Sequence, residues 1–80
     1  MAVNQLMLSG IIEIGKLNPE LQFQIRVQIS LRSNALNIMK HYSKKEAFEK
    51  YIRDREEKIK LLLGTDEISK ITLNGHAIYP

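Results

Sequence analysis

Residues 21–30, LQFQIRVQIS, alternate apolar and polar side chains without a break. No other feature of the chain constrains its fold as strongly, because period-two alternation is typical of a β-strand that buries one face. The apolar side chains are those of Leu21, Phe23, Ile25, Val27 and Ile29. We therefore expect a strand with these residues toward the core and the polar, even-numbered row toward the outside.

A second alternating stretch precedes this one and predicts a hairpin. Residues 5–14 carry most of their apolar side chains at even positions, with Gly10 where a bulge or bend is expected. Between the two stretches, Asn18 and Pro19 are turn residues, because proline fixes φ and keeps the preceding residue out of the helical region. A turn there places both apolar sets on one face, and a one-residue slip would expose one of them. We predict a hairpin over residues 4–32.

Residues 43–46, SKKE, indicate the start of a helix. They have the form of a capping box, in which Ser43 accepts from the backbone amide of Glu46 and the Glu46 side chain reaches back. Apolar residues then recur at helical spacing, and several acids precede bases by four residues. Gly64 suits the position that follows the last helical residue. The pattern predicts a helix that ends at residue 63.

The whole helical segment is expected to cover residues 35–63. One continuous helix would be about 43 Å long at 1.5 Å per residue. That is long for so small a body, so we favour a break near residues 42–43, with the continuous helix as the alternative. Residues 68–79 then alternate again and predict a last strand, with Asn74 and Gly75 as a bulge or turn.

These elements predict a single domain over residues 1–80. Its fold class is α+β: a small two-layer domain in β-β-α-β order, with an antiparallel sheet and one main helix on one face. The chain has no cysteine, so no disulfide framework supports it and packing must supply the stability. A chain this short buries little more than ~60% of its unfolded surface, which favours a homodimer.

Side chains that could support catalysis or bind a metal are few. The serines lack the sequence context of an activated nucleophile, and there is no cysteine to replace them. His41 and His76 are the only imidazoles, and neither has partners at metal-ligand spacing. We therefore expect no catalytic residues, no cofactor, no metal site, and a protein that is not an enzyme.

Positive charge is concentrated in the middle of the chain. The net charge is +3, and residues 34–63 hold eight bases against five acids. The outer hairpin face and the segment before the main helix both offer groups that contact phosphates. We hypothesise a small nucleic-acid-binding accessory or regulatory protein that contacts DNA or RNA. The residues assigned to binding are Arg26, Arg32, Lys40, Lys44 and Lys45.

Two short stretches carry a resemblance to a known class of proteins. Residues 4–10, NQLMLSG, and 18–23, NPELQF, resemble the first strand and following turn of bacterial single-stranded-DNA-binding proteins of the OB type, including their primosomal relatives. The resemblance implies nucleic-acid binding. The rest of the chain departs from that pattern, because a long charged helix stands in place of the middle strands and the stacking aromatics are missing. The resemblance therefore assigns no family.

The competing hypothesis is a homodimeric protein–protein interaction or regulatory adaptor module without nucleic-acid contact. Met7 and Ile11 fall on the outer face of the predicted hairpin, and long strands leave edges that proteins usually pair or cover. Two copies could pair at such an edge or over this face. The chain start lacks the regions of a signal peptide, and no apolar run approaches the ~20 residues that cross a bilayer. We expect a cytoplasmic protein without membrane contact.

Overall fold

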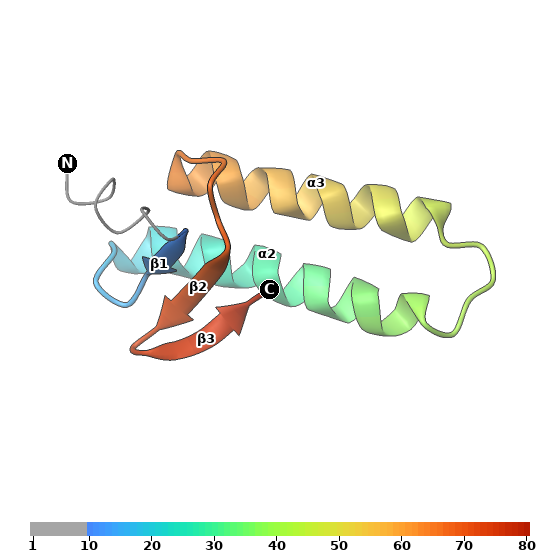
Figure 1. Ribbon diagram of the computed structural model, residues 1–80, viewed down its shortest axis with the longest axis horizontal. Coiled ribbons are helices and arrows are strands. Elements are labelled where there is room, and N and C mark those ends of the chain that lie inside the picture. The colour runs from blue at the N-terminus through green and yellow to red at the C-terminus, as the bar shows by residue number, and fades with distance from the viewer. Residues whose placement is uncertain (1–9) are drawn as a thin grey trace.

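The computed structural model describes residues 10–80, and these form a helical hairpin with a small sheet against one end (Figure 1). The order of the elements is β-α-α-β-β. The strands and helices are β1 (Ile11–Glu13), α2 (Pro19–Met39), α3 (Glu46–Leu63), β2 (Lys70–Leu73) and β3 (His76–Tyr79). The predicted β-β-α-β order with one main helix is therefore wrong, because the stretch expected to form the second strand is α2. Residues 4–9 of the predicted hairpin lie outside the described part.

Helix α2 begins at Asn18 and Pro19, for which the sequence predicts a turn. The Asn18 side chain caps the helix: its Oδ1 accepts from the backbone amides of Glu20, at 2.8 Å, and Leu21, at 3.4 Å. Pro19 occupies the first helical position, where its missing N–H costs nothing and its fixed φ suits the helix. Asn-Pro is therefore a helix start here, and the chain continues as helix through the alternating stretch.

The alternating stretch is compatible with a helix, because every second residue of its apolar row lies on the same helical face. Residues four apart share a face, and Ile25 and Ile29 are buried in the core, with Leu21 packed against it. The two residues between them point elsewhere. Phe23, which the strand prediction placed in the core, is 64% exposed, and Val27 is half-buried. Half of the row therefore builds the core, and the other half forms a second face.

The sheet is mixed and not antiparallel as predicted. Its order is β1-β2-β3, with β1 parallel to β2 and β2 antiparallel to β3. The single predicted strand over 68–79 is two strands, because Asn74 and Gly75 both take positive φ, 52° and 85°, and close a tight hairpin turn. The register shifts between Ile71 and Thr72.

Helix α3 lies within the predicted helical segment, and the chain leaves the helical path between residues 40 and 45. The predicted capping box is wrong, because the cap position belongs to Lys45 and no side chain caps the amides there. At the other end, Gly64 is left-handed, with φ 71°, and its amide donates to the carbonyls of Lys60 and Leu61. The Thr65 amide also donates to the Lys60 carbonyl, which completes a Schellman motif.

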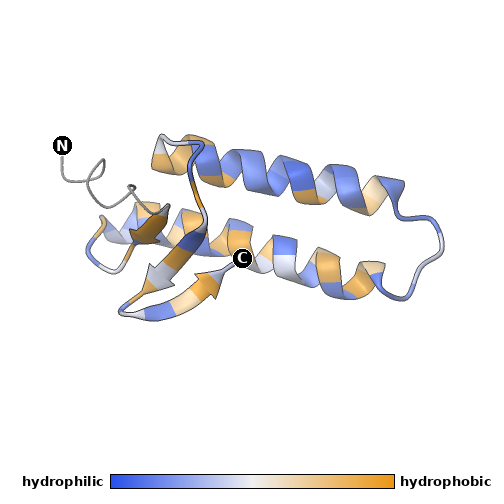
Figure 2. Cartoon of the chain, in the orientation of Figure 1, coloured by the Kyte–Doolittle hydropathy of each residue, from blue (hydrophilic) through white to orange (hydrophobic). Residues whose placement is uncertain are grey.

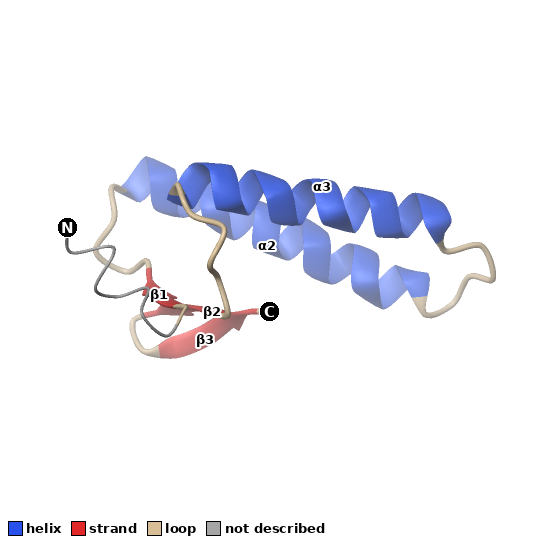
Figure 3. Cartoon of the chain, turned by 45° about the horizontal axis from the view of Figure 1, so that its top comes forward, coloured by secondary structure: helices blue, strands red, loops and turns tan. Residues whose placement is uncertain are grey.

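The core sits where the sheet meets the helical hairpin, at the end where α2 begins and α3 finishes (Figure 3). It is a cluster of isoleucines that come from both helices, from β2 and from the segment around β1. They are Ile12, Ile14, Ile25, Ile29, Ile59 and Ile71. The other half of the hairpin extends beyond the sheet toward the 40–45 loop (Figures 1 and 3). Helix–helix packing is therefore the main source of burial in that distal half.

Polar contacts between the helices lie next to this core. Arg55, which lies between the buried Ile52 and Ile59 of α3, donates from Nη1 to the Gln28 Oε1 at 3.0 Å. The Arg32 Nε donates to the Glu56 Oε2 at 2.8 Å. Each pair joins α2 to α3. The Nε of Arg55 is buried beside these contacts without a hydrogen-bond partner.

Candidate interaction surface

The residues of α2 that do not face the core form a second apolar row. We define this outer row as Phe23, Val27, Leu31 and Ile38. Phe23 is 64% exposed and Ile38 is 46% exposed, whereas Val27 and Leu31 are half-buried. Their spacing of four, four and seven residues keeps them along one side of the helix. The row covers about 22 Å of the helix at 1.5 Å per residue.

A groove opens between the two helices in the distal half of the hairpin. The residues that line this interhelical groove are Leu31, Asn34, Ala35 and Ile38 of α2 and Ala47, Phe48 and Tyr51 of α3. Its volume is about 380 Å³, which is at the small end of the ~300–1,000 Å³ typical of ligand sites. The lining is almost wholly apolar, so the groove suits large apolar side chains better than a charged ligand.

A second hollow connects this groove to the start of the outer row. It lies beside Phe23 and is lined by Arg26, Val27, Ser30 and Leu31 as well. Leu31 lines both depressions. The outer row therefore runs along both depressions, from the exposed Phe23 ring to Ile38 in the groove.

Helix α3 is more hydrophilic along its length than α2 (Figure 2), and the charged residues are distributed very unevenly between the two helices. Ten of the 18 residues of α3 are charged, against three of the 21 residues of α2. One of those three, Arg32, is already paired with Glu56, which leaves Glu20 and Arg26. Depletion of charge together with exposed aromatic side chains is the composition found at the centre of protein interfaces.

The five residues assigned to nucleic-acid binding do not share one surface. The Arg32 side chain is only 13% exposed, and its guanidinium lies 4.6 Å from the centroid of the Tyr79 ring. Arg26 is exposed on α2 beside Phe23. Lys40 follows it by 14 residues, about 21 Å along the helix axis. The polar sheet face that was expected to display both arginines does not exist, because its residues belong to α2.

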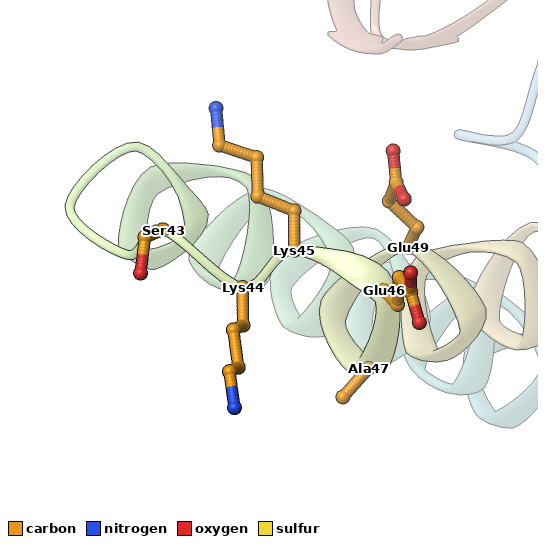
Figure 4. A pocket seen from close by; sticks show the side chains of 6 residues that line it. All are labelled: Ser43, Lys44, Lys45, Glu46, Ala47 and Glu49. Atoms are coloured by element: carbon orange, nitrogen blue, oxygen red, sulfur yellow. The ribbon is translucent and has the colours of Figure 1, made fainter.

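The two remaining lysines, Lys44 and Lys45, come directly before the first residue of α3 (Figure 4). Lys44 and Lys45 point to opposite sides of the chain there, and Glu46 and Glu49 lie in the same depression. These two glutamates occupy the first turn of α3, where a negative charge is already favourable next to the free backbone amides. The arrangement therefore does not gather cations around one point at which a phosphate could be held.

The imidazoles are also far apart. His41 lies in the loop between the helices and His76 in β3, at the other end of the structure. Within residues 10–80, no three histidine, aspartate or glutamate side chains are close enough together to hold a metal ion. The helices of this same part of the chain lack the combined length and apolar character needed to cross a membrane.

One carboxylate has an unusual environment, at the sheet end of the molecule. Oε2 of Glu13 accepts from the amides of Gly15, at 2.6 Å, and Asn74, at 2.9 Å. Oε1 accepts from the Thr72 hydroxyl, at 2.8 Å, and the Gly75 amide, at 3.0 Å. The hydrogen bond from the Gly75 amide, followed by those from Asn74 and Thr72, lowers the pKa of Glu13 to about 2. All four donors are groups of this same chain, and three of them come from β2 and the β2–β3 turn. Glu13 therefore joins β1 to that turn and has a structural role.

Comparisons with known proteins add no relative: no protein family, no curated protein and no solved structure matches the chain. The resemblance to OB-type single-stranded-DNA-binding proteins also loses its structural basis over residues 18–23. Those residues are the cap and first turn of α2, where the resemblance implied a turn between strands. Residues 4–9 of the resemblance, and Met7 of the predicted outer face, lie outside the described part. The outer row and the interhelical groove therefore carry the functional interpretation.

Proposed function

We propose that this chain is a non-enzymatic protein-interaction module that binds an apolar helical segment along the outer row and the interhelical groove. The observation that carries the proposal is the exposure of Phe23, at 64%, on a helix with only three charged residues. A large aromatic side chain in water forfeits burial that is worth about 1.5–3 kcal/mol. A surface of this kind is characteristic of proteins that bury it against a partner.

The shape of the surface favours a helical partner. The interhelical groove lies between two helices in the half of the hairpin that no strand covers (Figure 3). Helix-in-groove recognition uses anchors on one side of a helix, three or four residues apart, that enter such a groove. The groove meets this need because apolar side chains from both helices line it and Asn34 is its one polar residue.

Photo-crosslinking tests this proposal directly. Replacing Phe23 with p-benzoyl-phenylalanine places an aromatic photoprobe at the same position on the surface. We expect irradiation in a cell extract or in the purified protein to join it to one defined polypeptide. The matched control places the same photoprobe at Lys58, on the exposed side of α3. Equal yields at the two positions would contradict the proposal.

Nucleic-acid binding is the alternative. Fewer residues support it than the sequence indicated, because the five assigned residues do not share one surface. This alternative rests on the net charge of +3 and on Lys40, Lys44 and Lys45, which are exposed around the loop between the helices. Fluorescence anisotropy with labelled single-stranded DNA, duplex DNA and RNA tests it. If the lysines bind phosphates, affinity falls with salt, by ~0.7–0.9 in log K per log salt for each phosphate neutralised. A Lys44→Ala/Lys45→Ala variant should then bind more weakly, and no binding at low salt would exclude this alternative.

A further inference from the structure

We infer that the partner of this surface is a second copy of the chain: two α2 helices pack antiparallel about a two-fold axis, and Phe23 of each copy enters the interhelical groove of the other. The inference rests on the proposed function, because it names the occupant of the same surface. It follows from the presence of a projecting side chain and a matching groove on one side of one helix.

The positions of the projecting ring and the groove along α2 set the orientation. Phe23 lies near the start of α2, and the groove residues Leu31 to Ile38 lie in its second half. In an antiparallel pair, Phe23 stands opposite Ile38 of the second copy, and Ser30 and Leu31 lie next to the two-fold axis. The same rotation places the second Phe23 at the first groove. Both rings and both grooves are then filled by one isologous contact, which closes at two chains.

The spacing of the surface residues supports helix-on-helix packing. Val27, Leu31, Asn34 and Ile38 follow one another by four, three and four residues. This is the spacing of the residues that meet the holes of the facing helix in a two-helix coiled coil. Asn34 is the single polar member of this set, and it is exposed in the monomer. In the antiparallel pair, Asn34 stands opposite Val27 of the second copy, near the edge of the contact with water.

Charge and size are both compatible with this pairing. Pairing two α3 helices would remove many charged side chains of both signs from water, whereas pairing two α2 helices removes few. The molecule measures 44 × 21 × 19 Å. One of its long faces is therefore comparable in area with the ~800 Å² that each partner buries in an interface of standard size.

Measuring the mass in solution, by light scattering and sedimentation equilibrium of the full chain, tests the inference. We expect the mass of two chains at micromolar concentration, and the mass of one chain for Phe23→Glu. Each dimer loses two equivalent contacts in that variant, so its dissociation constant should rise about 100-fold or more. Circular dichroism should show the fold unchanged, because the replaced ring is 64% exposed in the single chain.

The chain offers a matched control for this substitution. Leu61 is another large apolar side chain, 72% exposed, but it belongs to α3 and lines neither the interhelical groove nor the hollow beside Phe23. Leu61→Glu should therefore leave the mass at two chains. A Phe23→Glu variant that remains a dimer would overturn the inference, and so would a loss of the dimer in both variants.

Single cysteines test the antiparallel arrangement, because the chain has none of its own. Ser30→Cys lies near the proposed axis and should form a disulfide-linked dimer on mild oxidation. Asn37→Cys is exposed on the same helix, but the two copies of it would lie about 20 Å apart at 1.5 Å per residue. It should stay reduced, and Lys58→Cys on α3 should do the same. Linkage at both Ser30 and Asn37 would show a parallel pair and overturn the inference.

The outcomes separate this inference from the proposed function. If the purified chain has the mass of one copy at every concentration, while the Phe23 photoprobe joins a different polypeptide in extract, the self-pairing is wrong and the interaction module stands. If the photoprobe joins nothing more than the Lys58 control does and the chain is a monomer, both are wrong. A dimer that the Phe23 photoprobe links to itself supports both.

Discussion

Glu13 shows how a single side chain can hold two distant parts of the chain together. Its carboxylate accepts from three backbone amides and one hydroxyl, and Thr72, Asn74 and Gly75 lie about sixty positions further along the chain. The charged form is the better acceptor, so these donors favour it and lower its pKa to about 2. Glu13 is therefore a residue whose effect on stability depends on pH.

We predict that Glu13 stabilises the fold at neutral pH and loses this effect in acid. Its folded pKa, about 2, is below the ordinary value of 4.5. The stabilisation is therefore complete above about pH 4.5 and is lost as the pH falls through 4.5 toward 2. Urea denaturation should show that Glu13→Gln is less stable than the wild type at pH 7, with the difference narrowing by pH 2. Glu57→Gln, on the exposed side of α3, is the control. A Glu13→Gln deficit of equal size at both pH values would contradict the prediction.

Single residues also mark what could and could not be predicted about the site. Arg26, Lys44 and Lys45 are exposed, as a binding role requires. Arg32 looked equally available in the sequence, but Glu56 and the Tyr79 ring hold it. Contacts of this kind depend on which elements pack together, so they cannot be predicted from the number and positions of charged residues in the sequence.

At the scale of elements, α2 explains why the alternating stretch was assigned to a strand. An apolar residue at every second position is also an apolar residue at every fourth, so the pattern contains a helical face within it. The decisive signals lay upstream: Asn18 and Pro19 are a helix cap and first residue as well as a turn. The Gln, Leu and Arg residues of the stretch also favour helix. If the stretch is taken as a helix, its apolar residues divide into two sets, and the set that does not face the core begins the outer row with Phe23 and Val27.

The sheet illustrates a different limit. The sequence indicated extended structure near residues 11–13 and 70–79, and strands do occur there. The parallel pairing of β1 with β2 joins residues 59 positions apart, such as Ile12 and Ile71. No local pattern specifies such a partner, because alternation fixes which face of a strand is buried and leaves its neighbour open. The predicted antiparallel sheet in β-β-α-β order was therefore wrong once the stretch expected to form its second strand proved to be α2.

The cap of α2 gives a prediction at the element scale. Asn18→Ala removes the acceptor for the amides of Glu20 and Leu21. We expect it to reduce the free energy of unfolding by ~0.5–2 kcal/mol, as other cap removals do. Asn18→Asp retains an acceptor oxygen at the same place and should stay close to the wild type. Chemical denaturation measures both, and equal stability of the alanine variant and the wild type would show that the cap contributes nothing.

At the scale of the whole molecule, the structure divides into a packed end and an extended end. The isoleucine cluster joins sheet and helices at one end, and the distal half of the hairpin carries the interhelical groove. A chain of this size has little apolar surface to spare, yet α2 keeps several large apolar side chains outside its core. This division makes the two kinds of position on α2 separable by experiment.

Ile25 and Phe23 lie two residues apart and should respond in opposite ways. Ile25 is fully buried among the core isoleucines, so Ile25→Ala should cost ~2–5 kcal/mol of unfolding free energy through lost burial and a cavity. That is a large part of the ~5–15 kcal/mol typical of a whole domain, so the variant should be much less stable than the wild type. Phe23→Ala removes a ring that the single chain leaves mostly in water, so its folded monomer should lose little.

Urea denaturation at several protein concentrations distinguishes the two effects. In the wild type, the midpoint should rise with concentration, because a dimer that forms only from folded chains stabilises them by mass action. Phe23→Ala should weaken or abolish this dependence while unfolding, at high dilution, near the wild-type midpoint. Ile25→Ala should lower the midpoint at every concentration. A Phe23→Ala variant as unstable as Ile25→Ala at high dilution would place the ring in the core and contradict the assignment of Phe23 to an interaction surface.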